Sequence, residues 1–360
     1  MPYTIHIGPY HPALEEPYKL SVHCAADTVQ EASIEIGVTC RAIELLLVQS
    51  REWVPAVTLI ERVCGICSNV HAMTFCRPAE QIAGIEVPAR AQYIRTIIAE
   101  LERIHSHLLW AGVAAECIGF QTLFLEIYAL REQVMDLVET ISGNRVNYGT
   151  NRIGGVNRDI PDPEPLISAV QAMAKPIEKE VVPAYMNNPT ATRRMASIGP
   201  LTKAQAIEWC VVGPMARASG LEIDIRNDRP YNAYQELGFK MVTRQEGDVQ
   251  ARGVARALEV LESIRLVTEA LRNIPPGPLR AFEGMPKIPP GAGFAVTEGP
   301  RGEAFYYIAS DGGRTPVRVK IRTPSFVNIP PLEVITIGQQ FGDMSLIQAS
   351  TDPCIACIDR

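Results

Sequence analysis

Apolar residues recur at three- and four-residue steps along the middle of the chain. The clearest case is residues 88–112, where such a stripe would form one face of a helix. Pro88 stands near the start of this stretch and Gly112 near its end, where these two residue types commonly punctuate helices. Similar patterns predict further helices over residues 41–53, 123–142, 164–180, 203–219 and 248–273. We therefore expect a helical core.

The two ends of the chain follow a different pattern. Short runs at 19–24 and 33–39 predict strands, as do runs at 305–309 and 317–321, which a Ser-Asp-Gly-Gly-Arg turn joins. Residues 151–165 are rich in Gly, Asn, Asp and Pro and predict a loop. The expected fold class is mainly α with small β elements, a helical core flanked by N- and C-terminal β segments. We expect a single domain over 1–360, divided into a β-rich start (1–40), the helical core (41–273), a Pro/Gly-rich β segment (274–331) and a C-terminal helix and metal-binding tail (332–360). The last short helix is expected over residues 331–345.

Composition narrows the class of protein. The chain has 360 residues of which 47% are apolar, enough for a sizeable core. A net charge of -6 argues against a nucleic-acid partner, which would need a basic surface. The start lacks a signal-peptide pattern, and no run of about 18 apolar residues occurs. We therefore expect a cytoplasmic chain that does not span a membrane but can dock on a membrane partner.

Nine cysteines provide the candidate chemistry. Cys64 and Cys67 form one C-x-x-C pair, and Cys354 and Cys357 form another close to the end of the chain. Two such turns offer four thiolates, a soft ligand set that suits zinc, an iron–sulfur cluster or nickel. The other five are expected to be small buried apolar residues: Cys24, Cys40, Cys76, Cys117 and Cys210.

The spacing of the two pairs bears on the kind of site. Zinc ribbons keep their two knuckles about 15–20 residues apart, whereas these pairs lie nearly the whole chain apart. Only the global fold can bring the two pairs together. This fits a buried catalytic metal better than a structural metal site within one short segment. Spacing alone still leaves open structural zinc, an iron–sulfur cluster, a catalytic thiolate-bound metal and no shared site.

The surroundings of the pairs resemble a known family. Arg-Val-Cys-Gly-Ile-Cys-Ser-Asn-Val-His (62–71) and Asp-Pro-Cys-Ile-Ala-Cys (352–357) resemble the two signature motifs of the [NiFe] hydrogenase large subunit. Residues 8–17, 100–110 and 151–156 are similar to the energy-converting, membrane-bound branch, which includes CO-induced hydrogenases. They are also similar to the 49 kDa quinone-site subunit of respiratory complex I, which lacks the four cysteines.

The resemblance implies a nickel–iron centre. Cys67 and Cys357 would bridge the two metals, Cys64 and Cys354 would bind nickel alone, and the iron would carry carbon monoxide and cyanide. Heterolytic splitting of dihydrogen needs a hydride acceptor beside a base. The metal pair would take the hydride, Cys354 the proton, and a nearby carboxylate would relay that proton. Glu16 matches the family position for the relay, and the adjacent Glu15 is its obvious competitor.

The resemblance also assigns residues around the metals. Arg301 would lie over the diatomic ligands and donate hydrogen bonds to cyanide, and Pro300 would help to shape the pocket. Ser325 would donate to another cyanide, although hydroxyls in turns more often cap the backbone. His71 would form a hydrogen bond near a bridging sulfur.

Other matching positions are less decisive. Glu44 matches a glutamate that helps bind magnesium in many relatives, but Arg360 stands where those relatives carry a histidine. This puts magnesium in doubt, and Arg360 could instead place a positive charge near Glu44. His11 matches a histidine near the quinone in complex I and here would tune the proton path. His105 and His107 lie in the expected long helix, on either an exposed polar stripe or a buried network; the exposed interpretation is preferred for His105.

The remaining inferences concern partners. Nucleotide-binding loops are absent from the sequence, and too few paired cysteines remain for an iron–sulfur relay. Electrons would therefore pass to an iron–sulfur cluster on a small partner subunit and on to ferredoxin. Further soluble and integral membrane subunits would attach the chain peripherally to the cell membrane and couple dihydrogen–proton chemistry to ion movement. The alternatives are a non-catalytic complex-I-like coupling subunit with structural zinc, and a redox protein with an iron–sulfur cluster.

Overall fold

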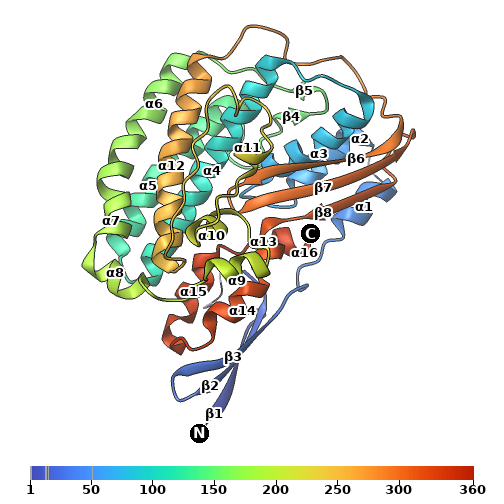
Figure 1. The fold of residues 1–360 in the computed structure, drawn as a ribbon. Coiled ribbons are helices and arrows are strands. Elements are labelled where there is room, and N and C mark those ends of the chain that lie inside the picture. Colours follow the sequence, from blue (N-terminus) through green and yellow to red (C-terminus); the bar gives the residue numbers. More distant parts are fainter. Residues whose placement is uncertain (1, 13, 15, 51) are drawn as a thin grey trace.

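The computed structural model describes residues 2–12, 14, 16–50 and 52–360. A bundle of long helices packs beside a three-stranded antiparallel sheet, and a second three-stranded sheet projects from the bottom of the view in Figure 1. The small sheets and dominant helices confirm the expected fold class. The bundle is built mainly from α4 (Ala89–Cys117), α5 (Gln121–Ser142), α6 (Pro163–Pro176) and α12 (Val249–Arg272).

Helix α4 is the central helix of this bundle. Its predicted apolar stripe is buried against α5 and α12, and it continues for a turn beyond Gly112. Gly112 is therefore not the end of the helix. A Cβ at this position would collide with the ring of Tyr128 on α5, so the glycine allows the two helices to approach closely.

Several predicted helices are interrupted. The predicted helix at 41–53 is shorter, as α1 (Ile43–Ser50), and the next helix already begins at Trp53. The stretch 203–219 divides into α9 (Lys203–Glu208) and α10 (Gly213–Ala218), because Cys210 and Gly213 have positive φ angles that interrupt a right-handed helix. Helix α6 continues through the π-helical turn η1 (Ile177–Val181). Before the C-terminal region, the structure also contains helices that the pattern did not predict: α2 (Trp53–Glu61), α3 (Ser68–Ala83), α7 (Val182–Met186), α8 (Pro189–Met195) and α11 (Ile225–Asp228).

The sheets only partly match the prediction. The predicted hairpin is present as β7 (Gly302–Asp311) and β8 (Arg318–Arg322), but β6 (Pro290–Gly299) precedes it and was not predicted. The predicted loop at 151–165 contains a small β ladder. The remaining strands are β1 (Pro2–Ile7), β2 (Lys19–Ala25), β3 (Thr28–Glu35), β4 (Asn151–Arg152) and β5 (Gly155–Val156).

Short helices form the end of the chain. The single helix predicted over 331–345 is replaced by several segments, with Gly338 in the left-handed region between two of them. Among the described residues, none of the helices has both the length and the apolarity needed to cross a bilayer. The segments are α13 (Pro324–Asn328), α14 (Pro330–Thr336), η2 (Phe341–Asp343), α15 (Met344–Thr351) and α16 (Ile355–Asp359).

The N-terminal sheet packs against this C-terminal region. The apolar face of β2, which includes Leu20 and Val22, forms one buried cluster with Met344, Ile355 and Ile358. Because residues from both ends of the chain share this cluster, α16 is held between the N-terminal sheet and the rest of the molecule. Cys357 lies on this helix, and Cys354 directly precedes it.

Candidate metal centre

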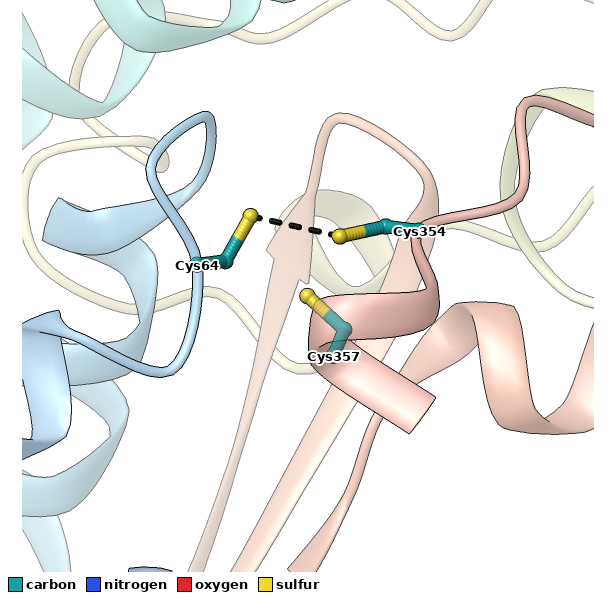
Figure 2. A group of neighbouring side chains, drawn as sticks. All are labelled: Cys64, Cys354 and Cys357. Carbon is teal, nitrogen blue, oxygen red and sulfur yellow. Dashed lines mark hydrogen bonds between the residues drawn. The ribbon is translucent and has the colours of Figure 1, made fainter. Parts of the chain in front are cut away.

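The two cysteine pairs meet in the interior. The Sγ atoms of Cys64 and Cys354 lie 3.4 Å apart, with Cys357 beside them (Figure 2). The Sγ atoms of Cys67 and Cys357 are also 3.4 Å apart. All four side chains are buried. A disulfide would need a sulfur separation of about 2.05 Å, so these are separate thiols. Thiols this close, converging from both ends of the chain, can share one metal centre.

Local backbone geometry shapes each pair. The N–H groups of Ile66 and Cys67 lie 3.2 Å and 3.4 Å from the Sγ atom of Cys64, which places two donors on this sulfur. Cys67 is the N-cap of α3, and Cys354 is the N-cap of α16, with Cys357 inside that short helix. Each C-x-x-C segment is therefore the start of a helix, where N–H groups favour negative charge.

The pKa values of the buried cysteines indicate that the site needs a cation before all four thiols can ionise. Hydrogen bonds from Cys354, Cys357 and Cys67 hold the pKa of Cys64 well below its ordinary value. Hydrogen bonds with Cys354, Cys64 and Cys67, together with burial, raise the pKa of Cys357 well above it. The buried cluster thus favours one thiolate among several thiols. Ionising all four requires added positive charge, which a bound metal supplies.

A hairpin tip forms one wall of the centre. Gly299 and Gly302 pair across the β6–β7 ladder, so Pro300 and Arg301 are the two residues of the turn. Arg301 is not a surface arginine, because only 4% of it is exposed. Its Nε and Nη2 atoms donate to the carbonyl and carboxylate of Asp352 at 2.8 Å and 2.6 Å. The arginine therefore connects the hairpin tip to the segment that carries Cys354.

A small cavity lies beside Cys67 and Cys357, the pair expected to bridge the metals. Its other lining residues are Val70, His71, Gly299, Pro300, Arg301, Ala304 and Pro324. The cavity is enclosed by apolar groups on most sides and by one guanidinium. These features fit a metal carrying small diatomic ligands, because such ligands need little space and Arg301 can donate to one of them.

His71 connects this cavity to the sheet. Its Nε2 atom lies 3.4 Å from the Sγ atom of Cys357, and its Nδ1 atom lies 2.6 Å from the hydroxyl of Tyr306. Burial lowers the pKa of His71 to about 4, so the ring is neutral near pH 7. A tautomer that accepts from Tyr306 and donates to Cys357 satisfies both contacts. The sequence pattern singled out His71 but not Tyr306, which the alternation of β7 buries.

Glu16 lies between the protein surface and residues 352–360, which we call the tail. One of its carboxylate oxygens accepts hydrogen bonds from the backbone N–H groups of Ile355 and Ala356, the latter at 3.1 Å. Glu16 also lines a surface depression together with the exposed His11. Burial raises the pKa of Glu16, although the two backbone donors and Arg301 oppose this shift. Glu15, the competing acid, lies outside the described residues.

Ser325 and Glu44 each contact the C-terminal segment, and both contacts are among the alternatives that the sequence left open. The Ser325 hydroxyl accepts from the Cys354 N–H at 3.1 Å, so it caps the backbone beside a metal ligand. Glu44 lies 3.1 Å from the Nε atom of Arg360 and 3.2 Å from the Nζ atom of Lys320. The proximity of Arg360 was anticipated. Lys320 and Arg360 already neutralise the charge of the Glu44 carboxylate, so this carboxylate is not suited to bind a magnesium ion as well.

Two sequence-based expectations are wrong. Cys40 and Cys210 are exposed rather than buried. His105 is buried in α4 rather than exposed, and His107 is buried as well, with its Nε2 atom 2.9 Å from Glu259. The network that buries His107 lies between α4, α10, α11, α12 and β6, and its charged members include Glu100, Arg103, Arg217, Asp224, Arg226, Glu259 and Glu298.

Two family models match the chain. Residues 117–287 and 280–360 match the model of the respiratory-chain NADH dehydrogenase 49 kDa subunit. Residues 41–111, which contain the first cysteine pair, match the model of the nickel-dependent hydrogenases. The two matches together run through both cysteine motifs.

Similar proteins cover nearly the full chain. The carbon monoxide-induced hydrogenase of Rhodospirillum rubrum is 38% identical, over 99% of both chains. The membrane-bound hydrogenase subunit alpha of Pyrococcus furiosus is 37% identical, over 99% of this chain and 87% of that one. A solved structure of a membrane-bound sulfane sulfur reductase, an archaeal respiratory membrane complex, superimposes with a TM-score of 0.94 at 31% identity, covering 99% of this chain and 98% of that one.

Proposed function

The chain belongs to the family of [NiFe] hydrogenase large subunits and complex I 49 kDa subunits, and from this premise we propose that it is the catalytic subunit of an energy-converting [NiFe] hydrogenase. It would interconvert protons and dihydrogen. Within this family the hydrogenases and the quinone-linked subunits share one fold, so the fold does not separate them. The side chains at the site must carry the argument.

One observation carries the proposal: four buried thiols from opposite ends of the chain converge in two pairs, each 3.4 Å apart. A scaffold that bound no metal would gain nothing from four converging cysteines at this depth. Cys67 and Cys357 border the small cavity and are suited to bridge nickel and iron. Cys64 and Cys354 would complete the nickel ligands.

When bound, the metal pair would supply the two-electron chemistry that makes or breaks dihydrogen. The chain itself would manage the proton. Cys354 would hold it at its Sγ atom as a terminal thiol. Glu16, which contacts the backbone just after Cys354, would pass it to the surface depression that it shares with His11. Burial of Glu16 supports this role, because its raised pKa favours taking up a proton.

Electrons must leave by another route. We infer a small iron–sulfur partner subunit that exchanges them with ferredoxin, and membrane subunits that couple the reaction to ion translocation. The names of the relatives support this inference, since one is a membrane-bound hydrogenase subunit and the similar structure is a respiratory membrane complex. The chain would then be attached to the cytoplasmic side of the membrane through these partners.

Metal analysis of the purified complex tests the proposal. Nickel and iron in equal amounts at this subunit, with infrared bands of carbon monoxide and cyanide, are expected. The competing function is a non-catalytic coupling subunit with structural zinc. Its support is the relatives that carry a dehydrogenase rather than a hydrogenase name, such as a subunit of the F(420)H(2) dehydrogenase of Methanosarcina mazei, which is 34% identical over 99% of this chain and 97% of that one. Zinc without nickel would favour that function.

A further inference from the structure

The side chain of Arg41 connects the two cysteine turns. Its Nη1 and Nη2 atoms donate to the carbonyls of Arg62 and Val63 at 2.7 Å and 2.8 Å, directly before Cys64. Nη2 also donates to the carbonyl of Ala356 at 2.5 Å, directly before Cys357. One guanidinium thus holds the backbone of both metal-binding segments, although it touches none of the sulfurs in these contacts.

Neighbours of Arg41 hold the rest of the tail. Both carboxylate oxygens of Asp359 accept from backbone N–H groups, those of Gly37 and Thr39, at 2.8 Å each. Glu44 pairs with Arg360 at 3.1 Å. Residues 37–44, which we call the clasp, therefore bind the tail at three successive points. Arg41 is the member of the clasp that also reaches the first cysteine pair.

We propose that Arg41 is a positioning residue that sets the spacing between the two C-x-x-C turns and so retains the metal centre. This inference rests on the proposed function only in that the four cysteines share a metal. The two C-x-x-C turns lie far apart in the sequence, so their spacing depends on contacts between segments that the fold brings together. Arg41 supplies the contact that joins the tail to the 62–64 segment.

The geometry requires an arginine. The guanidinium is planar and presents five N–H donors in a fixed fork, so it can reach carbonyls on two segments at once. A lysine ammonium at this position keeps the charge but offers its donors from a single atom. Arg41→Lys should therefore keep part of the bridge, and Arg41→Met should remove it while keeping a long side chain.

The test compares metal release from the purified complex. Arg41→Met, Arg41→Lys and wild type are incubated with a chelator, and retained metal is measured with time. The matched control is Arg314→Met, which removes an exposed arginine whose ion pair is with Glu52, away from the cysteines. Removing a residue that orients metal ligands commonly weakens metal binding by about 10- to 100-fold. We expect metal release at least about tenfold faster in Arg41→Met, an intermediate rate in Arg41→Lys, and the wild-type rate in Arg314→Met.

A second measurement separates positioning from general instability. Hydrogen–deuterium exchange should accelerate at residues 355–358 in Arg41→Met, while exchange in α4 and α12 stays at the wild-type level. Wild-type metal retention together with wild-type protection of 355–358 would overturn the role of Arg41, as would equal losses in Arg314→Met. If the wild-type protein held zinc in place of nickel and iron, the proposed function would fail, yet the same release rates would still decide the role of Arg41.

Discussion

Glu16 is the residue whose surroundings most directly suggest a role in catalysis. Its carboxylate reaches inward to the N–H groups of Ile355 and Ala356 and borders a surface depression on its other side. The same two donors would stabilise the ionised form, whereas burial favours the neutral form. A carboxyl under opposing influences of this kind can change protonation state with little loss in either direction, which a relay requires.

Replacing Glu16 by glutamine tests this role. The amide oxygen can still accept from Ile355 and Ala356, so the tail should stay in place, but the side chain no longer exchanges a proton. We expect metal content at the wild-type level and hydrogen–deuterium isotope exchange slowed by about 10²- to 10⁴-fold. Exchange is measured by mass spectrometry of the gas phase over the purified complex.

Glu15→Gln is the control for this experiment. It makes the same chemical change one residue earlier and should leave isotope exchange close to wild type. If isotope exchange were slow in Glu15→Gln and normal in Glu16→Gln, the relay would be Glu15 and our assignment to Glu16 would be wrong. Slow exchange in both variants would show that the two acids act together.

The buried contact between α4 and α12 makes stability depend on pH. Burial lowers the pKa of His107 to about 4, against an ordinary value of 6.5, although Glu259 opposes the shift. Because the folded-state pKa is depressed, the stabilisation is complete above pH 6.5 and is lost as pH falls toward 4. Linkage predicts a loss of about 2 kcal/mol in unfolding free energy between pH 7 and pH 5 from this group.

His107→Gln isolates that contribution. Glutamine can still donate to Glu259 but does not titrate, so the variant should lose about 2 kcal/mol less than wild type over the same pH interval. Denaturant unfolding at the two pH values measures the difference. The buried His105 remains in both proteins and cancels. Equal pH slopes in the two proteins would contradict the neutral, buried state assigned to His107.

The β6–β7 hairpin tip depends on a close contact with α10. A Cβ on Gly213 would collide with the carbonyl of Arg301, and the residue also has a positive φ of 69°. Gly213→Ala should displace the tip and with it Arg301. The cost of the backbone strain alone is about 1–2 kcal/mol, and the collision comes in addition.

Gly84→Ala separates these two effects. Gly84 has a similar φ of 62°, but a Cβ there would meet no atom within 4 Å. We expect the melting temperature to fall in both variants, and the infrared bands of the centre to shift only in Gly213→Ala. Unchanged bands in Gly213→Ala would show that the tip tolerates the displacement.

The sequence predicts elements better where one periodic stripe covers a long segment. The stripe of 88–112 located α4 to within a few residues, whereas 41–53 formed a shorter helix and 203–219 divided into two. Helix α3 was missed because twelve of its sixteen residues are buried, so its sides do not differ in polarity. The charged core stayed one of two open alternatives for a related reason. Residues such as Glu100 and Arg103 can be surface groups unless a partner distant in sequence, such as Arg226, is known.

At the candidate site, the sequence motifs identified the expected metal ligands and pocket residues, but not the residues that hold them in place. The four cysteines, Arg301 and His71 stand in recognisable sequence contexts. Asp352, Tyr306 and Arg41 were not singled out, because their contacts join segments that are far apart in the chain. Such contacts depend on the tertiary fold, which local sequence patterns do not specify.

At the scale of the whole molecule, the centre lies where the two ends of the chain meet. The N-terminal sheet, the clasp and the first cysteine pair all contact the tail, so residues far from it in the sequence hold it in place. A metal that binds only the docked arrangement stabilises the whole fold by mass action. The gain is about 4 kcal/mol when the metal is present at about 1,000 times its Kd.

Cys357→Ser tests this coupling. The substitution removes a sulfur that borders the cavity and contacts both Cys67 and His71, and a hydroxyl is a poor substitute for a soft bridging ligand. We expect the variant to lack nickel and iron, to melt at a lower temperature and to expose residues 352–360 to proteolysis. Cys210→Ser, the same change at an exposed cysteine, should keep its metals and its melting temperature. An active Cys357→Ser variant with a full metal complement would contradict the ligand scheme, because hydrogen activation would then not need the sulfur that joins the tail to the first pair.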